Sequence, residues 1–290
     1  MYGRSGPFLD GLDARDEAFV VEIPPDAHVW LAKPKVLRKP PKNRKGRPKK
    51  YPRLRARDAK PSEVRNLAKY SPGFTEQRAQ KYQTRDGSRG PEVWEIKWHT
   101  CWRKSSTEKL ISNQYTLVVA GNVLTDETKF FLSNRVPGRD GWTLRRVLRV
   151  AFGRWAVEGC FREAKEELGL DHFECRGWRC IHRHLYTSIL SQLFCASTRR
   201  ALSPSEEVLS GELLTMEQVR RATDVVIETL DLNAHDRDRK LTAEAARQNY
   251  HARRNATAAK SHEKTRRKQL ADLGIDPDRI RSIRVSRSKE

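Results

Sequence analysis

The stretch with the clearest chemical potential surrounds a single glutamate. On a helix over residues 154–165, one carboxylate shares a side with three cations: Arg154, Glu158, Arg162 and Lys165. They would span about 16 Å along the axis at ~1.5 Å per residue. Carboxylates can hold the two magnesium ions of phosphodiester cleavage, and neighbouring cations can hold the phosphates. The simpler interpretation is a set of i,i±4 surface ion pairs worth ~0.3–0.5 kcal/mol each, which spacing alone favours.

A second cluster could in principle bind zinc, since five potential ligands lie close together: His172, Cys175, Cys180, His182 and His184. Their spacing matches no standard zinc finger, and the second half of the cluster falls in a predicted helix. We therefore interpret them as buried thiols and helix-surface histidines. The chain has five cysteines, an odd number without framework spacing, so we expect reduced thiols in a cytosolic compartment.

Helices are the elements predicted to position Glu158. Apolar residues at three- and four-residue spacing indicate a helix beginning near Trp142. A second helix is predicted over 155–167, with Gly169 as its C-terminal cap, and a third over 178–202. Apolar contacts on the sides adjacent to Glu158 are assigned to Trp155, Val157, Phe161 and Ala164. A stripe on the third helix is expected to pack on a sheet: Leu185, Ile189, Leu193 and Ala196.

The sheet itself is predicted from β-branched and alternating runs at residues 18–23, 93–99, 115–120 and 129–132. Residues 8–15 are typical of a short amphipathic helix, with Asp10 and Asp13 on its exposed surface. Asp26 fits a turn after two prolines. A helix followed by a buried strand indicates an α/β fold.

Charge is the strongest global feature, with 58 Lys and Arg against 37 Asp and Glu, a net +21 that favours a polyanionic partner. Residues 33–60 hold fourteen Lys or Arg, one acidic residue and five prolines, which predicts an exposed arm. Within it, residues 45–50 resemble the AT-hook. Arg47, Lys49 and Lys50 are thus candidate DNA contacts, either in a narrow minor groove or as a generic phosphate-binding arm.

A second basic region occupies residues 236–290, where sixteen Lys and Arg face eight acidic residues. A helix is predicted over 242–273, and its cations either form a solvated face or contact phosphate. No apolar run approaches the ~18 residues that a membrane span needs, so no membrane partner is expected.

The stretch around Glu158 resembles the signature of insertion-sequence DDE transposases, which have a ribonuclease-H-like core. That signature is tyrosine, two residues, arginine, three residues, glutamate, six residues, lysine. Arg154, Glu158 and Lys165 match it in identity and spacing, whereas Ala151 stands at the tyrosine position. The resemblance implies that Glu158 is the third metal-binding carboxylate, with Mg²⁺ or Mn²⁺ as cofactor. It also implies that Arg154, Arg162 and Lys165 handle DNA phosphates.

Other stretches extend the resemblance over most of residues 1–200. Three of them resemble the segments around the Glu-bearing helix of the family: residues 129–134, 169–174 and 177–184. Tyr2-Gly3 resembles the pair just after the family's second catalytic aspartate. This alignment implies that the first two catalytic aspartates lie before Met1. We therefore expect an amino-terminally truncated chain with little or no transposase activity alone.

The implied architecture is a partial ribonuclease-H-like catalytic core, interrupted by a β-rich insertion and followed by helices. A core remnant is predicted at residues 1–23 and the β-rich insertion, with the basic arm, at 24–137. The helical part of the core is predicted at 138–203 and a basic helical carboxy-terminal region at 204–290.

Three functions remain open at this point. The first is DNA transposition by part of a transposase that binds transposon ends and target as a homodimer on duplex DNA, in the nucleoid of a bacterial cytoplasm. The second is a non-catalytic DNA-binding or dimerising protein that regulates a full-length transposase. The third is an unrelated basic protein, such as an RNA-binding factor.

Overall fold

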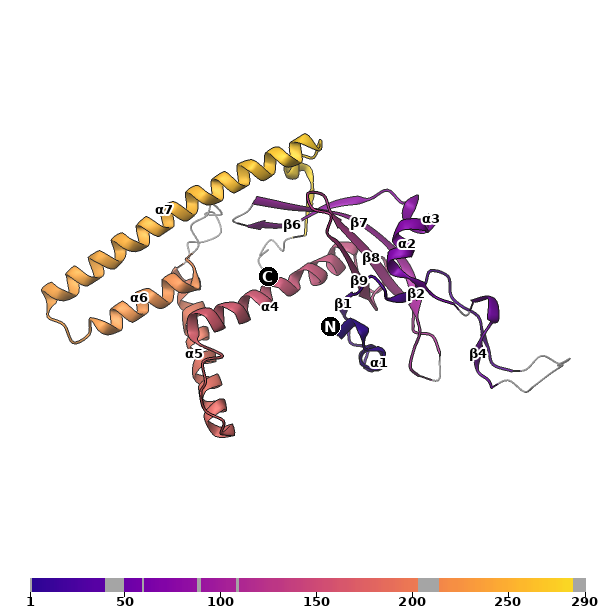
Figure 1. Cartoon of the computed structure of the whole chain (residues 1–290), viewed down its shortest axis with the longest axis horizontal. Helices are drawn as coiled ribbons and strands as arrows, with labels where there is room; N and C mark the ends of the chain where they lie inside the picture. Colours follow the sequence, from indigo (N-terminus) through magenta and orange to yellow (C-terminus); the bar gives the residue numbers. More distant parts are fainter. Residues whose placement is uncertain are drawn as a thin grey trace. The chain divides into compact units, whose positions relative to one another are not determined.

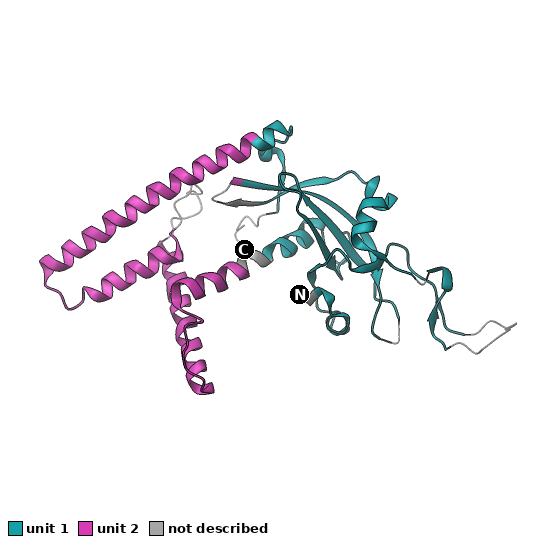
Figure 2. Cartoon of the chain, viewed as in Figure 1, with its two compact units in different colours: residues 1–86, 91–153, 269–290 teal, residues 87–90, 154–268 magenta. Residues whose placement is uncertain are grey.

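The computed structural model describes residues 2–39, 50–58, 60–87, 90–107, 110–202 and 214–283 (Figure 1). It is an α/β fold, as the sequence predicts. The chain forms two compact units, coloured separately in Figure 2. Unit 1 comprises residues 1–86, 91–153 and 269–290, and unit 2 comprises residues 87–90 and 154–268. No described helix combines the length and apolar character that a membrane crossing requires.

In the part of the chain that the structure describes, helices occur in both units, and three short 3₁₀ turns accompany them. The α-helices are α1 (Gly6–Ala14), α2 (Val64–Tyr70), α3 (Pro72–Thr75), α4 (Leu144–Leu168), α5 (Trp178–Leu202), α6 (Met216–Glu228) and α7 (Ala234–Asp272). The 3₁₀ turns are η1 (Tyr2–Arg4), η2 (Ala56–Asp58) and η3 (Pro277–Arg279). The predictions of a helix at 8–15 and of another at 178–202 are confirmed by α1 and α5.

The strands are β1 (Val20–Ile23), β2 (His28–Trp30), β3 (Val36–Leu37), β4 (Arg53–Leu54), β5 (Ser62–Glu63), β6 (Gln80–Gly87), β7 (Gly90–Arg103), β8 (Tyr115–Asn122), β9 (Thr128–Ser133) and β10 (Arg281–Ser282). The main sheet has the order β1-β9-β8-β7-β2-β5, with β6 beside β7 and β10 beside β6. Its neighbours along that order are antiparallel, whereas β10 runs parallel to β6. The four predicted strand regions are confirmed by β1, β7, β8 and β9.

Alternation along the central strands gives unit 1 two apolar layers, one on each face of the sheet. On β8, Leu117 points into the layer that contains Leu9 of α1, and Val118 points into the layer that contains Leu148 of α4. Successive strand residues face opposite sides, so one run of apolar residues serves both layers. The two layers hold α1 and the first half of α4 against the sheet.

Two local features fix the start of unit 1. The side-chain oxygen of Ser5 accepts a hydrogen bond from the Phe8 backbone N–H at 3.4 Å and so caps the first turn of α1. Gly3 lies directly on β1, since a Cβ there would be only 2.4 Å from the carbonyl oxygen of Glu22. Glycine is therefore required for η1 to pack on this strand.

The prediction of two separate helices, one beginning near Trp142 and one over 155–167, is wrong, because α4 runs unbroken through Gly153 from Leu144 to Leu168. A glycine inside a helix costs about 1 kcal/mol relative to alanine, which the burial of Val147 and Leu148 in unit 1 outweighs. The predicted end at Gly169 is confirmed, since this residue follows α4 with φ of +62°.

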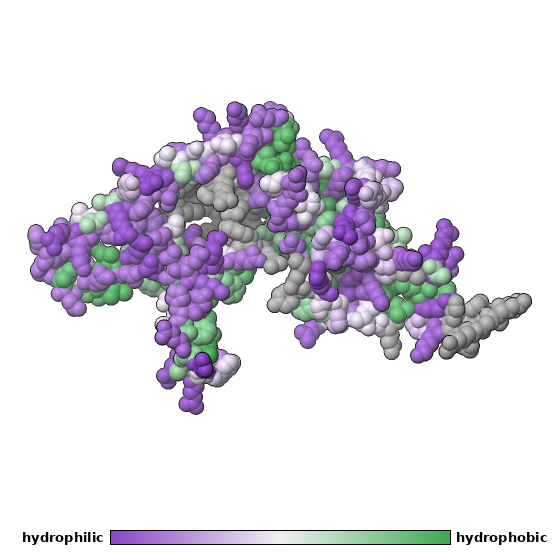
Figure 3. Space-filling model, in the orientation of Figure 1, coloured by the Kyte–Doolittle hydropathy of each residue, from purple (hydrophilic) through white to green (hydrophobic). Residues whose placement is uncertain are grey.

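The packing of the apolar stripe of α5 on the sheet stays a prediction, because α5 and the sheet belong to different units. Ile189 and Leu193 are 51% and 62% exposed, and α5 belongs to unit 2, whereas the sheet belongs to unit 1. Figure 3 shows hydrophobic side chains at the surface of this helix. Within unit 2, α5 packs on α6, where Cys195 joins Met216 and Val219 in a small core.

Two short paired strands lie within the basic arm. β3 and β4 form a two-stranded antiparallel ribbon with Val36 opposite Leu54, and Asp58 accepts a hydrogen bond from the backbone N–H of Lys35 at 3.2 Å. The chain end also returns to unit 1, because Ile283 is buried in the layer of α4. The carboxy-terminal helix begins earlier than predicted, at Ala234.

Candidate functional site

Glu158 lies in the second half of α4, within unit 2, and is exposed. The helix is continuous, so residues four apart recur on the same side of it at ~6 Å intervals along the axis. Arg162 follows Glu158 by four residues and lies 4.0 Å from Glu166, one turn further on. The helix therefore places Glu158 and Arg162 one turn apart on the same side, as their spacing predicts.

The other predicted cations are found in different settings. Lys165 Nζ lies 3.6 Å from a carboxylate oxygen of Asp171, and both side chains are about half exposed. Such exposed pairs are worth roughly 0–1 kcal/mol, so a phosphate group can compete for the lysine. Lys50 is exposed. Arg47 and Lys49 lie outside the described residues, and the side chain of Arg154 is likewise outside what the structure describes.

The apolar side chains beside Glu158 only partly match the prediction. Ala164 is buried, but Val157 and Phe161 are 57% and 58% exposed. The second half of α4 is joined to α5 by a hydrogen bond from the Gln192 side-chain amide to the carbonyl oxygen of Cys160 at 2.9 Å. The side of α4 that carries Glu158 is thus an open surface rather than a packed one.

Within the described residues, no three His, Cys, Asp or Glu side chains gather closely enough to hold a metal ion. Glu158 alone does not fit the two-metal site that the resemblance implies, because such a site needs several carboxylates. We accordingly derive no metal-dependent step from these residues.

The histidine and cysteine cluster also differs from its prediction. Cys180 is exposed and Cys175 is half-buried, so these thiols are not buried as expected. His184 is half-buried, and its Nε2 lies 2.7 Å from the carbonyl oxygen of Gly169. This contact ties the first half of α5 to the turn that ends α4.

A polar network in unit 1 was missed from the sequence. Asp10, predicted on the surface of α1, forms an ion pair with Arg103 in which both side chains are under 10% exposed. It also accepts hydrogen bonds from the backbone N–H and the hydroxyl of Ser106. Breaking such a buried pair leaves an uncompensated charge. Asp10 is therefore a structural anchor between α1 and the end of β7.

Asp13, one turn later, extends the same network and likewise corrects the prediction of a surface residue. It accepts a hydrogen bond from the Tyr115 hydroxyl at 2.5 Å and another from the Asn134 amide at 3.0 Å. The tyrosine hydroxyl also lies 3.3 Å from Arg103. Burial, followed by the bond to Asp13, raises the pKa of Tyr115. The tyrosine therefore stays protonated and donates to Asp13.

Asp10 is expected to make the stability of unit 1 depend on pH. Burial by itself raises the pKa of Asp10, but the hydrogen bonds from Ser106 and the charge of Arg103 outweigh it, so the pKa lies below its ordinary value of 3.8. A depressed folded-state pKa contributes stability above the unfolded-state pKa, and this contribution is lost as pH falls through the folded-state pKa. The free energy of unfolding should therefore fall on acidification below about pH 4.

The measurement is urea unfolding of the chain and of Asp10→Asn over a pH series from about 5 to 2.5. The variant lacks this carboxylate, so its free energy of unfolding should fall less steeply in that window. Parallel curves for the two proteins would show that Asp10 is not the titrating group.

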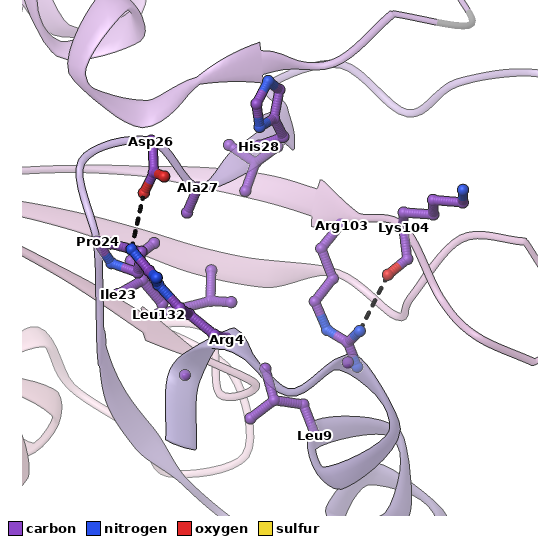
Figure 4. A pocket seen from close by; sticks show the side chains of 13 residues that line it. Arg4, Leu9, Ile23, Pro24, Asp26, Ala27, His28, Arg103, Lys104 and Leu132 are labelled. Carbon is purple, nitrogen blue, oxygen red and sulfur yellow. Dashed lines mark hydrogen bonds and ion pairs between the residues drawn. The ribbon is translucent and has the colours of Figure 1, made fainter. Parts of the chain in front are cut away.

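A cavity of about 400 Å³ lies beside this network, between η1, the start of α1 and the ends of β2 and β7 (Figure 4). Apolar side chains such as Leu9 and Leu132 line it, with Arg103 and Lys104 on one side and His28 on another. Arg4 lies 3.5 Å from Asp26, and both side chains are more than half exposed. The prediction of a turn at Asp26 is confirmed by the turn at Pro25 and Asp26.

A stretch of the chain that includes Asp10, Asp13 and part of the cavity wall has a match among known protein families. Residues 1–91 match the model of a DDE superfamily endonuclease. The match supports a relationship of DDE-transposase type and a nuclease-like function. It ends at the beginning of β7, so α4 and Glu158 lie outside the matched residues. No curated protein matches the chain.

Proposed function

We propose that this chain is the carboxy-terminal portion of a DNA transposase. In this proposal it binds transposon-end and target duplex DNA as a homodimer, and its complete form cleaves and transfers strands with Mg²⁺ or Mn²⁺. The match of residues 1–91 carries the proposal, because it does not involve the Arg–Glu–Lys spacing in α4. Two separate stretches of the sequence therefore point to one chemistry.

Glu158 is the carboxylate that we propose for the metal site. Its support is its exposure and its place on a rigid helix, which fixes it relative to Arg162 and Lys165. The further carboxylates would come from outside the described residues. The role proposed for the two cations is to hold backbone phosphates beside Glu158, where their present carboxylate partners are weak competitors.

Duplex DNA is supported as a partner by the charge of α7. Residues 245–271 contain eight Lys or Arg and one acidic residue, Glu263. Six of the cations are exposed: Arg247, Arg253, Arg254, Lys260, Lys264 and Lys268. Each phosphate that such a side chain neutralises releases condensed counterions, so affinity should fall steeply with salt.

Replacing Glu158 by glutamine tests the proposed site. In a transposase that includes this chain and the remaining carboxylates, E158Q should reduce strand cleavage ~100-fold or more, since even changes behind a metal ligand cost 10- to 100-fold. Duplex affinity, measured by fluorescence anisotropy, should change little. Glu166→Gln is the matched control, because it removes an equal charge two turns along the same helix and should cleave normally. Cleavage by E158Q near the unmodified rate would remove Glu158 from the site.

A DNA-binding or dimerising regulator is the second candidate. It is favoured by the exposed apolar side chains of α5, which suit a partner chain, together with the cations of α7. The two candidates differ in a mixing experiment with a full-length transposase. A regulator would bind the same transposon ends and inhibit cleavage in proportion to its concentration. A fragment of the enzyme would instead cleave DNA only when it is joined to its missing part.

A further inference from the structure

The first half of α5 carries an aromatic ladder, by which we mean Trp178, His182 and Tyr186. The three rings are four residues apart on one side of the helix. The Trp178 and His182 ring centroids are 3.8 Å apart with planes nearly perpendicular, and those of His182 and Tyr186 are 5.9 Å apart with planes only 23° apart. Contacts between neighbours therefore hold the rings in a continuous column.

The ladder is open to solvent, with Trp178 and Tyr186 74% and 65% exposed. Large aromatic side chains normally gain free energy by burial, and exposed groups of them often mark a binding surface. The following half of α5 is different in kind, because its exposed side chains are mainly aliphatic, such as Ile189 and Leu193. One exposed ring, Phe194, lies in that half at 55% exposure, whereas the three rings of the ladder are gathered in the first half.

The charge of α5 identifies the kind of partner. The helix contains four arginines and no acidic residue within its 25 residues. Arg179 and Arg183 each follow a ladder residue, and both are exposed. They project about 100° around the helix from the rings they follow, so cations flank the aromatic column. Rings beside cations suit nucleic acid, since bases stack on the rings and the cations hold the phosphates.

The exposure of the rings favours unpaired bases over duplex DNA. Bases within a duplex are already stacked on one another, so their faces are not free to cover a side-chain ring. A base that has separated from its neighbours can lie flat on an exposed ring such as Trp178 or Tyr186. The ladder therefore fits unpaired bases.

We propose that the aromatic ladder, with Arg179 and Arg183, is a stacking surface for unpaired bases of a nucleic-acid strand. The inference deepens the proposed function, on which it rests for the presence of DNA, by adding that unpaired nucleotides are held on α5. It assigns the ladder residues a role in binding and none in the chemical step.

The test is binding of the full chain to a fluorescein-labelled 12-nucleotide oligo(dT), compared with a duplex of the same length, by fluorescence anisotropy. Base–aromatic stacking is worth a factor of about 5 to more than 100 per base, so Trp178→Ala/Tyr186→Ala should weaken oligo(dT) binding at least about tenfold. Duplex binding should change less than about twofold, because it is dominated by phosphate contacts.

Two further variants serve as controls. Trp178→Phe keeps an aromatic face and should retain most of the oligo(dT) affinity. Tyr70→Ala removes an equally exposed aromatic ring, 67% exposed on α2 in the other unit, and should have no effect. Circular dichroism establishes that each variant is folded, and Tyr186→Ala alone replaces the double variant if the latter unfolds.

Unchanged oligo(dT) affinity in the folded ladder variants would overturn the stacking surface, whatever the duplex result. A change in oligomeric mass with unchanged oligo(dT) affinity would also overturn it and would make the ladder a protein interface. If the chain binds oligo(dT) through the ladder but does not bind duplex DNA, the stacking surface stands and the proposed transposase function is contradicted.

Discussion

Asp10→Asn is expected to destabilise unit 1 by about 3–5 kcal/mol, which is typical of removing one partner from a buried ion pair. The Arg103 side chain is 7% exposed, so its charge would remain in the interior without a carboxylate. Its other hydrogen bonds, to the Tyr115 hydroxyl and the carbonyl oxygen of Lys104, are to neutral groups and cannot neutralise the charge. Asparagine also has one oxygen fewer to accept from Ser106.

Urea unfolding followed by tryptophan fluorescence measures this effect, since five of the seven tryptophans lie in unit 1. Asp16→Asn is the matched control, because Asp16 pairs with Arg135 at 3.0 Å but its side chain is 89% exposed. That variant should cost less than about 1 kcal/mol. Equal losses in the two variants would mean that the Asp10 pair is not buried in solution.

A double substitution separates the pair from its surroundings. Asp10→Asn/Arg103→Met removes both charges, and an apolar replacement of a buried pair is often close to neutral. The double variant should therefore be more stable than Asp10→Asn. The measured quantity is the loss of unfolding free energy, which should be smaller in the double variant than the sum of the losses in the single variants.

Much of unit 1 could be predicted from the sequence because its signals are local. The run at residues 18–23 and the alternation at 93–99 predicted β1 and β7, and the amphipathic spacing of residues 8–15 predicted α1. Each depends on neighbours within a few residues, which propensity and period describe. The antiparallel order of the strands was not evident, since it depends on pairings between distant segments.

The Asp10 network could not be predicted for the same reason. Asp10 and Arg103 are 93 residues apart, and Asp13 and Asn134 are 121 apart. One signal was available, because Asp10 and Asp13 adjoin Leu9 and Leu12 and so border the buried side of α1. A helical pattern shows that border but cannot show the arginine that neutralises a carboxylate there.

At the candidate site, the local element could be predicted but its packing could not. The helix bearing Glu158 and the turn at Gly169 were predicted from spacing and confirmed, but the surroundings of the helix were not. Val157 and Phe161 suggested packing on both sides, and in the structure they are exposed. An apolar residue in a sequence indicates the capacity to be buried, and the presence of a partner decides whether it is.

The two halves of α4 should therefore respond differently to truncation of a large side chain. Leu148 is fully buried in one layer with Trp94 and Phe131. Leu148→Ala should lower the free energy of unfolding by about 2–5 kcal/mol, because it leaves a cavity in that layer. Phe161→Ala is the matched control on the same helix and should cost less than about 1 kcal/mol, because that ring is 58% exposed.

Urea unfolding of both variants measures the difference, and duplex-DNA anisotropy shows whether Phe161→Ala leaves binding intact. Similar losses of stability in the two variants would mean that Phe161 is covered in solution. Since Phe161 lies less than one turn from Glu158, a partner surface would then lie beside the proposed carboxylate. A small effect at Phe161 and a large one at Leu148 would instead confirm that α4 is anchored through its first half, leaving the half with Glu158 open for DNA.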